Sequence, residues 1–200
     1  MLQLIGNFSQ LTKPVRVQVL PSKIFMCGGL INEPSSDYTT VRDCLYNYIK
    51  TKDTDLFEKI VLAEDIKKWL QDGEYTNLLD LEKDLAGLVS AIPLIVESPG
   101  SIAELGSFIY MEEVAKKLLI IISQNDAETQ SFINLGTINK FKSLKQGNDD
   151  RVFIYPWVRN HQGLIQKSKL LNLADLMYEA IKEFHNNQSD TEKFDENPSH

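Results

Sequence analysis

The chain has 200 residues, of which 42% are hydrophobic and 24% charged, and its formal net charge is -7 at pH 7. This length and composition predict one globular domain, and the acidic balance disfavours a protein that holds nucleic acid by its phosphate backbone. The apolar runs fall far short of the roughly 20 residues needed to cross a bilayer. Because the first residues also lack the features of a secretory signal, we expect a cytoplasmic protein without membrane contact.

Cysteines and histidines give no sign of a metal or redox site. Cys27 and Cys44 match no ligand spacing, and the three histidines are scattered at positions 161, 185 and 200. We therefore expect neither a bound metal nor another cofactor.

Short apolar runs and stretches of helical spacing alternate along the chain. The expected strands are Lys23 to Cys27, Lys59 to Ala63, Ala91 to Val96, Leu118 to Ile122 and Val152 to Tyr155. The expected helices are Ser36 to Lys50, Ile66 to Leu70, Leu78 to Val89, Ser101 to Ala115 and Leu164 to Phe184. Continuous apolar strands separated by helices indicate an α/β, Rossmann-like or flavodoxin-like domain, with a parallel sheet of about five strands covered on both faces. We expect this domain over residues 23–185, after an N-terminal extension (1–22) and before a disordered tail (186–200).

Ligands of such sheets bind beyond the carboxyl ends of the strands. The predicted strand ends therefore nominate Gly28, Gly29, Glu64, Asp65, Glu97 and the turn from Ser98 to Glu104.

Glu82 lies in the middle of the apolar face of the helix predicted over 78–89, while Asp80, Lys83 and Asp84 lie on the opposite face. A carboxylate on an apolar face is costly unless it is paired or lines a cavity. Glu82 is therefore either a buried glutamate that pairs with an arginine or caps the backbone, or part of a pocket wall.

Glu104 also allows two interpretations. Ser101 and Glu104 have the spacing of a capping box with Ser101 as N-cap, which predicts a structural role. A glutamate in the first turn of a helix is also kept ionised by the helix dipole, and an ionised carboxylate can attack the anomeric carbon of a sugar. Gly100 and Gly106 flank it and would let a substrate or another backbone approach closely.

The turn Gly28-Gly29 offers backbone amides for a phosphate or a sugar oxygen. It lacks the GxGxxG fingerprint and the P-loop lysine, which excludes a standard dinucleotide or ATP site. Arg42, in the next helix, has three possible roles: neutralising a phosphate, pairing with Glu64 or Glu82, or lying in solvent. Glu64-Asp65 either caps a helix or faces the ligand.

Several motifs of the chain share their order and spacing with one known group of proteins. They are Ile24-Phe25-Met26-Cys27-Gly28-Gly29, Arg42, Ala63-Glu64-Asp65, Leu78-Leu79-Asp80-Leu81-Glu82 and the stretch from Glu97 to Phe108, extended by Lys117 to Ile120 and Ser131 to Gly136. Together they resemble the nucleoside 2-deoxyribosyltransferase-like effectors of bacterial retrons, over about Lys23 to Phe141.

The resemblance implies a Rossmann-like domain of five strands and N-glycosidic chemistry, in which a glutamate attacks the anomeric carbon while the base leaves. Glu104 matches this nucleophile, and Glu82 is the second catalytic candidate. The candidates for substrate binding are Gly28, Gly29, Arg42, Glu64, Asp65, Glu97, Ser98, Pro99, Gly100 and Ser101. Housekeeping deoxyribosyltransferases have aspartates where this chain has Ser98 and Ala91, which favours NAD or a (deoxy)nucleotide as substrate and water as acceptor.

The resemblance also implies an antiviral toxin that the retron's reverse transcriptase and its RNA-DNA product restrain until phage infection releases it. A homo-oligomer is expected. Three other classes stay open: a phosphoribohydrolase-like nucleotide hydrolase, a non-catalytic module that senses a nucleotide, and a structural subunit bound by an antitoxin.

Overall fold

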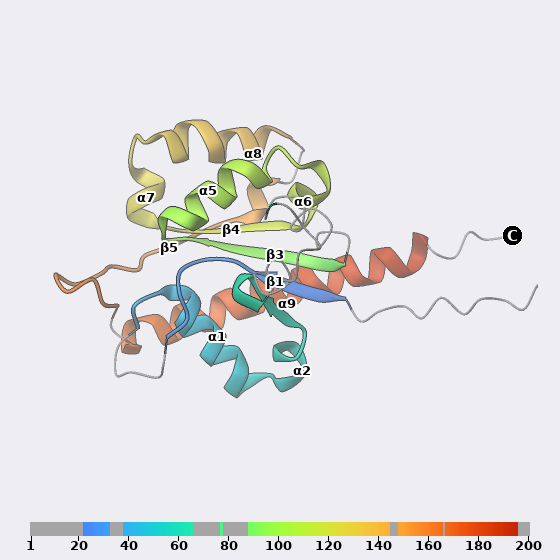
Figure 1. Cartoon of the computed structure of the whole chain (residues 1–200), viewed down its shortest axis with the longest axis horizontal. Helices are drawn as coiled ribbons and strands as arrows, with labels where there is room; N and C mark the ends of the chain where they lie inside the picture. The colour runs from blue at the N-terminus through green and yellow to red at the C-terminus, as the bar shows by residue number, and fades with distance from the viewer. Residues whose placement is uncertain are drawn as a thin grey trace, which may run out of the picture.

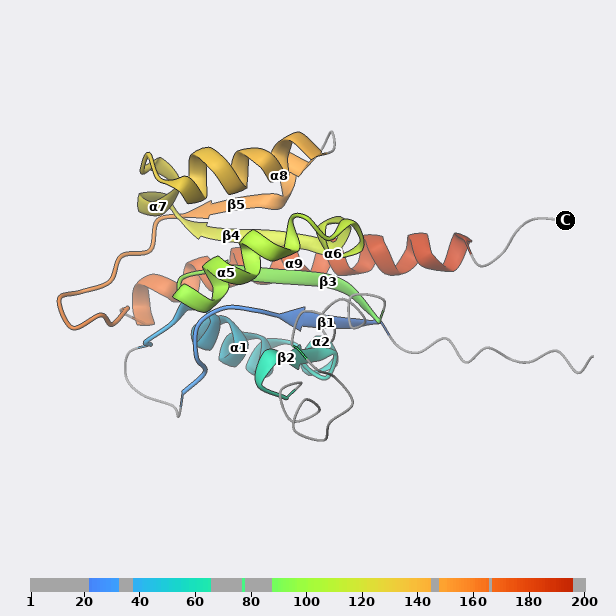
Figure 2. The ribbon, with the colours of Figure 1, turned by 45° about the horizontal axis from the view of Figure 1, so that its top comes forward.

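A computed structural model describes residues 22–32, 38–65, 77, 88–144, 148–165 and 167–195. Its centre is a five-stranded sheet in the order β2-β1-β3-β4-β5, and every pairing in it is parallel (Figures 1 and 2). The strands are β1 (Lys23–Met26), β2 (Ile60–Leu62), β3 (Val89–Val96), β4 (Leu118–Ser123) and β5 (Val152–Tyr155). The predicted α/β class, with five parallel strands, is confirmed.

Helices cover both faces of the sheet (Figure 1). One face carries α1 (Val41–Lys52), α2 (Thr54–Phe57) and α9 (Lys167–Asp195). The other face carries α5 (Pro99–Phe108), α6 (Glu112–Lys117), α7 (Gln124–Glu128), the π-helix η2 (Ile133–Ile138) and α8 (Asn139–Leu144), and the 3-10 helix η3 (Asn148–Arg151) leads into β5. Within the described parts of the chain, no helix is both long and apolar enough to cross a membrane.

The two helical layers explain why the inner strands are continuous apolar runs. Every residue of β3 and β4 is buried. Successive side chains of a strand point to opposite faces, so both faces of these strands need an apolar side chain. In β4, Leu118, Ile120 and Ile122 pack on the α5 side, whereas Leu119 and Ile121 pack on the α9 side.

The structure corrects the bounds of three predicted helices. Helix α1 begins at Val41 rather than at residue 36, because Thr40 is its N-cap. The single helix predicted over 101–115 is two helices, α5 and α6. Val89, predicted in a helix, begins β3, while residues 66–70 and 78–87 lie outside the described part.

Helix α9 continues to Asp195, through residues predicted as a disordered tail. These residues have no apolar period, but an established helix adds each further residue at little cost. Residues 196–200 lie outside the described part.

The strand order reverses between β1 and β3. Strand β2 lies on one side of β1, and the strands β3, β4 and β5 lie on its other side. The ends of β1 and β3 are bound to each other: the amide of Cys27 donates to the carbonyl of Pro93, and the amide of Ile95 donates to the carbonyl of Cys27. Such a switch point is where open α/β sheets bind their ligands. The candidate site is therefore at the carboxyl ends of β1 and β3.

Candidate functional site

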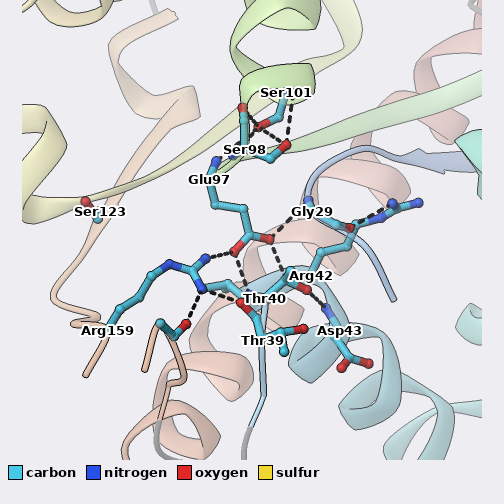
Figure 3. A network of polar contacts seen from close by, with 12 residues as sticks. Gly29, Thr39, Thr40, Arg42, Asp43, Glu97, Ser98, Ser101, Ser123 and Arg159 are labelled. Atoms are coloured by element: carbon cyan, nitrogen blue, oxygen red, sulfur yellow. Dashed lines mark hydrogen bonds and ion pairs between the residues drawn. The ribbon is translucent and has the colours of Figure 1, made fainter. Parts of the chain in front are cut away.

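The carboxylate of Glu97, directly after β3, is the centre of a polar network at the switch point (Figure 3). Its Oε1 accepts hydrogen bonds from the amides of Gly29 at 3.2 Å and Arg42 at 3.0 Å. Its Oε2 accepts from the amide of Val41 at 2.7 Å and from Nη2 of Arg159 at 2.9 Å. One carboxylate thus joins the turn after β1, the first residues of α1 and the loop that follows β5.

This carboxylate occupies the position that the sequence offers to a phosphate. A glycine turn and a helix N-terminus bind anions through their backbone amides, and here the amides of Gly29 and α1 donate to Glu97. Burial raises the pKa of Glu97, whereas the amides of Arg42, Val41 and Gly29 and the charge of Arg159 act to lower it. Its side chain is 1% exposed, so in this structure the carboxylate of Glu97 is held inside the fold.

The close approach of α1 to the turn requires both glycines. Gly28 has a φ of +155°, and a Cβ there would lie 3.1 Å from Cδ of Arg42 and 3.2 Å from Cβ of Ile95. A Cβ on Gly29 would lie 2.5 Å from Cγ2 of Thr40, a distance at which the two groups overlap. The pair is therefore explained by packing, without a ligand.

Arg42 is buried and pairs with Glu64, one of the partners that the sequence predicts. Its Nη1 and Nη2 donate to the two carboxylate oxygens of Glu64, both at 2.8 Å, and Nη1 also donates to the carbonyl of Gly29 at 3.0 Å. The Arg42 side chain is 1% exposed and that of Glu64 is 40% exposed. Asp65 is exposed beside this pair. The arginine fixes the end of β2 to α1, and this role accounts for its burial.

The turn after β3 is held by two serines. Ser98 is the N-cap of α5, and its Oγ accepts from the amide of Ser101 at 3.2 Å. Oγ of Ser101 accepts from the amides of Glu97 and Ser98, both at 3.0 Å, and donates to the carbonyl of Ser98. The capping box predicted for Ser101 and Glu104 is wrong, because the box is formed by Ser98 and Ser101, with Pro99 as the first helical residue.

Glu104 therefore lies in the second turn of α5, not in the first turn as the sequence predicts. The buried residues of this helix are Ser101, Leu105 and Phe108, which face the sheet, and Glu104 lies next to them and is partly buried. Its Oε2 is shielded from solvent. Side chains of a helix lean toward its N-terminus, so we expect the carboxylate of Glu104 on the side of α5 that faces its first turn.

Gly100 lies in an open position with respect to the described residues. Residues 100 and 104 are one turn apart on the same side of the helix. A Cβ on Gly100 would meet one described atom within 4 Å, Oγ of Ser98 at 3.8 Å, which is ordinary contact. Pro99 and Gly100 are both exposed. Unlike Gly28 and Gly29, Gly100 is thus not explained by packing within the described structure.

Two residues of the network escape the sequence prediction, and Glu82 lies outside the described residues. Arg159 is in the loop after β5, and Thr40 caps α1 by accepting from the amide of Asp43 at 3.0 Å. The sequence contains a signal for each of these two residues. The rule that nominated the ends of the first three strands applies equally to the end of β5, and Thr40 precedes an acidic residue by three positions, as N-caps often do.

Comparison with known proteins shows which family this chain resembles. The family model described as STM3845 retron effector protein matches residues 38–200. The Retron Ec86 putative ribosyltransferase/DNA-binding protein of Escherichia coli is 35% identical over 145 residues, which cover 71% of this chain and 44% of the relative. The Retron Ec73 putative ribosyltransferase/DNA-binding protein of Escherichia coli is 33% identical over 128 residues, or 62% of this chain and 39% of the relative. This chain thus spans about two fifths of the length of these relatives, and it belongs to the STM3845 retron effector protein family.

Proposed function

We propose that this chain cleaves the N-glycosidic bond of a nucleotide-type substrate, either NAD or a (deoxy)nucleotide, with Glu104 as nucleophile. The observation that carries the proposal is the position of Glu104 one helical turn after Gly100, where a Cβ would meet the described residues in no more than ordinary contact, beside the switch point of the sheet. A sugar ring next to α5 would find a carboxylate on one side and, as far as the described residues go, open space at Gly100. The name ribosyltransferase, given to both Escherichia coli relatives, supports the same chemistry.

The other described carboxylates at the site are held by hydrogen bonds within the fold. Glu64 is bound by both terminal nitrogens of Arg42, and Glu97 accepts hydrogen bonds from three amides and Arg159. A nucleophile must leave such partners before it attacks, which costs energy in the transition state. Both groups are fixed by the fold, so they position the site rather than react.

The reaction that we propose has two displacements. One oxygen of the Glu104 carboxylate forms a bond to the anomeric carbon, while the bond from that carbon to the base nitrogen breaks and the base leaves with the electron pair. A nucleobase takes up a proton as it leaves, whereas the nicotinamide of NAD leaves as a neutral molecule without one. Water then attacks the same carbon and gives up a proton, the glycosyl-enzyme ester breaks, and Glu104 leaves as a carboxylate. Glu82 is our candidate for the group that moves the proton.

The hydrogen bonds of Glu97 limit how the substrate can be bound. Because Glu97 uses the amides of Gly29 and α1, our proposal places the phosphate of a nucleotide outside the turn after β1. The exposed residues Pro99 and Gly100 are the described part of the α5 turn that is open to a ligand. We therefore propose that the sugar is bound over this turn and that Gly28, Gly29, Arg42 and Glu97 act on the substrate through the shape of the site.

The test is mass spectrometry of small molecules after incubation of NAD, deoxynucleotides and nucleosides with three proteins. These are the wild type, Glu104→Gln and a matched control, Glu113→Gln, at a position on α6 whose side chain is 68% exposed. We expect free base or nicotinamide from the wild type and the control, and none from Glu104→Gln. Equal release by Glu104→Gln would refute the role of Glu104.

The same experiment separates the alternative classes. A nucleotide-sensing module would bind one of these compounds and release no product, with or without Glu104. A phosphoribohydrolase-like enzyme would release base from nucleoside monophosphates and leave nucleosides intact. We also propose that the retron reverse transcriptase and its RNA-DNA product restrain the activity, so that their addition lowers the rate of product release.

A further inference from the structure

Arg159 lies in the loop after β5, at the same edge of the sheet as the candidate site. Strand β5 ends at Tyr155, and because every pairing in the sheet is parallel, its carboxyl end shares an edge with the carboxyl ends of β1 and β3. Nη2 of Arg159 donates at 2.9 Å to Glu97 (Figure 3), which precedes Gly100 by three positions. Three residues span at most about 11 Å, so the residue that binds Arg159 is close to the turn over which we propose the sugar.

The fold holds this arginine in one position. At the tip of the loop, the carbonyl of Asn160 accepts a hydrogen bond from the amide of Gly163 at 2.9 Å, and Oδ1 of Asn160 accepts from the amide of Gln162 at 2.9 Å. Nη1 of Arg159 donates to the carbonyl of Gly163 at 3.0 Å and also to the carbonyl of Thr39, directly before the N-cap of α1. A side chain that is ordered before a ligand arrives binds it at a smaller entropy cost.

The guanidinium of Arg159 has N–H donors that the described structure does not use. An arginine carries five N–H donors in one plane. Three of those of Arg159 are used in the hydrogen bonds to Thr39, Gly163 and Glu97, and the described residues provide no acceptor for the other two. The Arg159 side chain is 32% exposed, so a ligand at this edge of the sheet can contact it.

Arg42 and Arg159 both belong to the network around Glu97, but they differ in what they offer a ligand. Arg42 is 1% exposed and binds Glu64 with both terminal nitrogens. Arg159 binds Glu97, which also accepts hydrogen bonds from three backbone amides and so stays held when the arginine contacts a further group. Because Arg159 is paired with Glu97, it offers a ligand hydrogen-bond donors rather than an excess of charge.

We propose that Arg159 binds the 5′-phosphate of the substrate and thereby selects nucleotides over nucleosides. An arginine can bind a carboxylate with some of its donors and a phosphate with others, because the donors point in different directions in one plane. Glu97 occupies the amides of Gly29 and α1, so the phosphate needs donors outside the turn after β1. This inference rests on the proposed function, to which it adds the residue that recognises the phosphate.

The test uses two pairs of compounds that share a glycosidic bond and differ in the part that carries phosphate: dAMP with deoxyadenosine, and NAD with nicotinamide riboside. The kcat/KM of base release is measured for the wild type, Arg159→Gln and Arg159→Lys. Arg159→Gln should lower kcat/KM for the nucleotide of a pair by about tenfold to a hundredfold, as the loss of charge-assisted hydrogen bonds predicts, and should leave the value for the nucleoside within about twofold. Arg159→Lys keeps the charge and one donor group, so it should lose less.

Lys169→Gln is the matched control, because it also removes one positive charge, at an exposed position on α9, and it should leave all values unchanged. An equal fall of kcat/KM for the nucleotide and the nucleoside in Arg159→Gln would show that Arg159 supports the fold without contacting the phosphate, and would overturn the proposal. An unchanged value for the nucleotide would overturn it as well.

Calorimetric titration of the same compounds, in a Glu104→Gln background so that they are not consumed, separates this inference from the proposed function. The wild type might release no base while NAD or dAMP binds at least about tenfold more weakly after Arg159→Gln; then the glycosidic chemistry fails and the role of Arg159 stands. Base release and nucleotide binding that do not depend on Arg159 would leave the chemistry intact and overturn the role of Arg159. Absence of both base release and nucleotide binding would overturn both proposals.

Discussion

Oε2 of Glu97 lies 2.7 Å from the backbone nitrogen of Val41, so the first residue of α1 is bound directly to the end of β3. We predict that Glu97→Gln lowers the free energy of unfolding by about 2 kcal/mol. The amide nitrogen of glutamine cannot accept a hydrogen bond, and Arg159 loses its counter-charge. Urea denaturation measures the change, with Glu113→Gln as a surface control that should be neutral. Equal midpoints for Glu97→Gln and the wild type would contradict the network.

The strand ends and the network between them differ in how far the sequence predicts them. Apolar runs and glycine turns are local, so the end of β3 at Glu97 and the turn at Gly29 could be found from the sequence. The partners of Glu97 are not local, because Val41 is 56 positions away and Arg159 is 62 positions away. The role of Glu97 depends on strand order, which local patterns do not encode.

The predicted position of Glu104 in its helix was wrong for a different reason. Both Ser98 and Ser101 suit an N-cap, and the sequence prediction chose the one that pairs with a glutamate three positions later. Pro99 contained the signal that separates them, since proline is favoured as the first helical residue and so points to Ser98 as the cap. Two local rules therefore gave different N-caps, the capping-box spacing and the preference of proline for the first helical position, and the structure agrees with the second.

Packing of the turn against α1 predicts a second pair of changes. Gly29→Ala should lower the free energy of unfolding by about 2 to 4 kcal/mol, because its Cβ would lie 2.5 Å from Cγ2 of Thr40. Thr40→Ser removes that methyl group and keeps the hydroxyl that caps α1. The double variant should therefore regain part of the loss, which denaturation of all three proteins measures. No rescue by Thr40→Ser would show that the contact with Thr40 is not the cause.

The buried pair of Arg42 and Glu64 should respond unequally to the loss of either partner. Glu64→Ala leaves a cation whose side chain is 1% exposed, and we expect a loss of about 3 kcal/mol. Arg42→Met leaves a carboxylate that is 40% exposed and can be hydrated, so its cost should be smaller. In a double-mutant cycle, Arg42→Met should offset much of the effect of Glu64→Ala. A larger loss of stability from Arg42→Met than from Glu64→Ala would contradict a structural role for this pair.

Gly100 should behave in the opposite way to Gly29. At this exposed helical position a Cβ would be in ordinary van der Waals contact with Oγ of Ser98 and would clash with none of the described residues. Gly100→Ala should therefore stabilise the protein by about 0.5 to 1 kcal/mol. It should also reduce product release, because the methyl group would occupy space over the turn at which we propose that the sugar binds. Gly106→Ala is the control in the same helix, two residues beyond Glu104 and hence on another side, and it should leave activity unchanged. Full activity of Gly100→Ala would place the sugar elsewhere.

Asp53 should make stability depend on pH in the acidic range. Its Oδ2 accepts hydrogen bonds from Nζ of Lys182 and the hydroxyl of Tyr178, both at 2.8 Å, and its Oδ1 accepts from the amide of Leu56 at 2.9 Å. Lys182 first, then the Leu56 amide and Tyr178, hold the pKa of Asp53 well below its ordinary value. A carboxyl group with a lowered pKa stabilises the fold above its unfolded pKa of about 3.9 and loses this contribution as the pH falls toward the folded value.

Asp53→Asn removes this dependence, because the amide does not titrate and carries no charge for Lys182. The difference in unfolding free energy between the wild type and Asp53→Asn should be constant from pH 7 to about pH 5 and should shrink steadily below about pH 4. Urea denaturation at a series of pH values measures it, and added salt should reduce the difference because Lys182 is 40% exposed. A difference that stays constant down to pH 2 would mean that Asp53 titrates alike in the folded and unfolded chain, and that the bond from α9 to the start of α2 owes nothing to its charge.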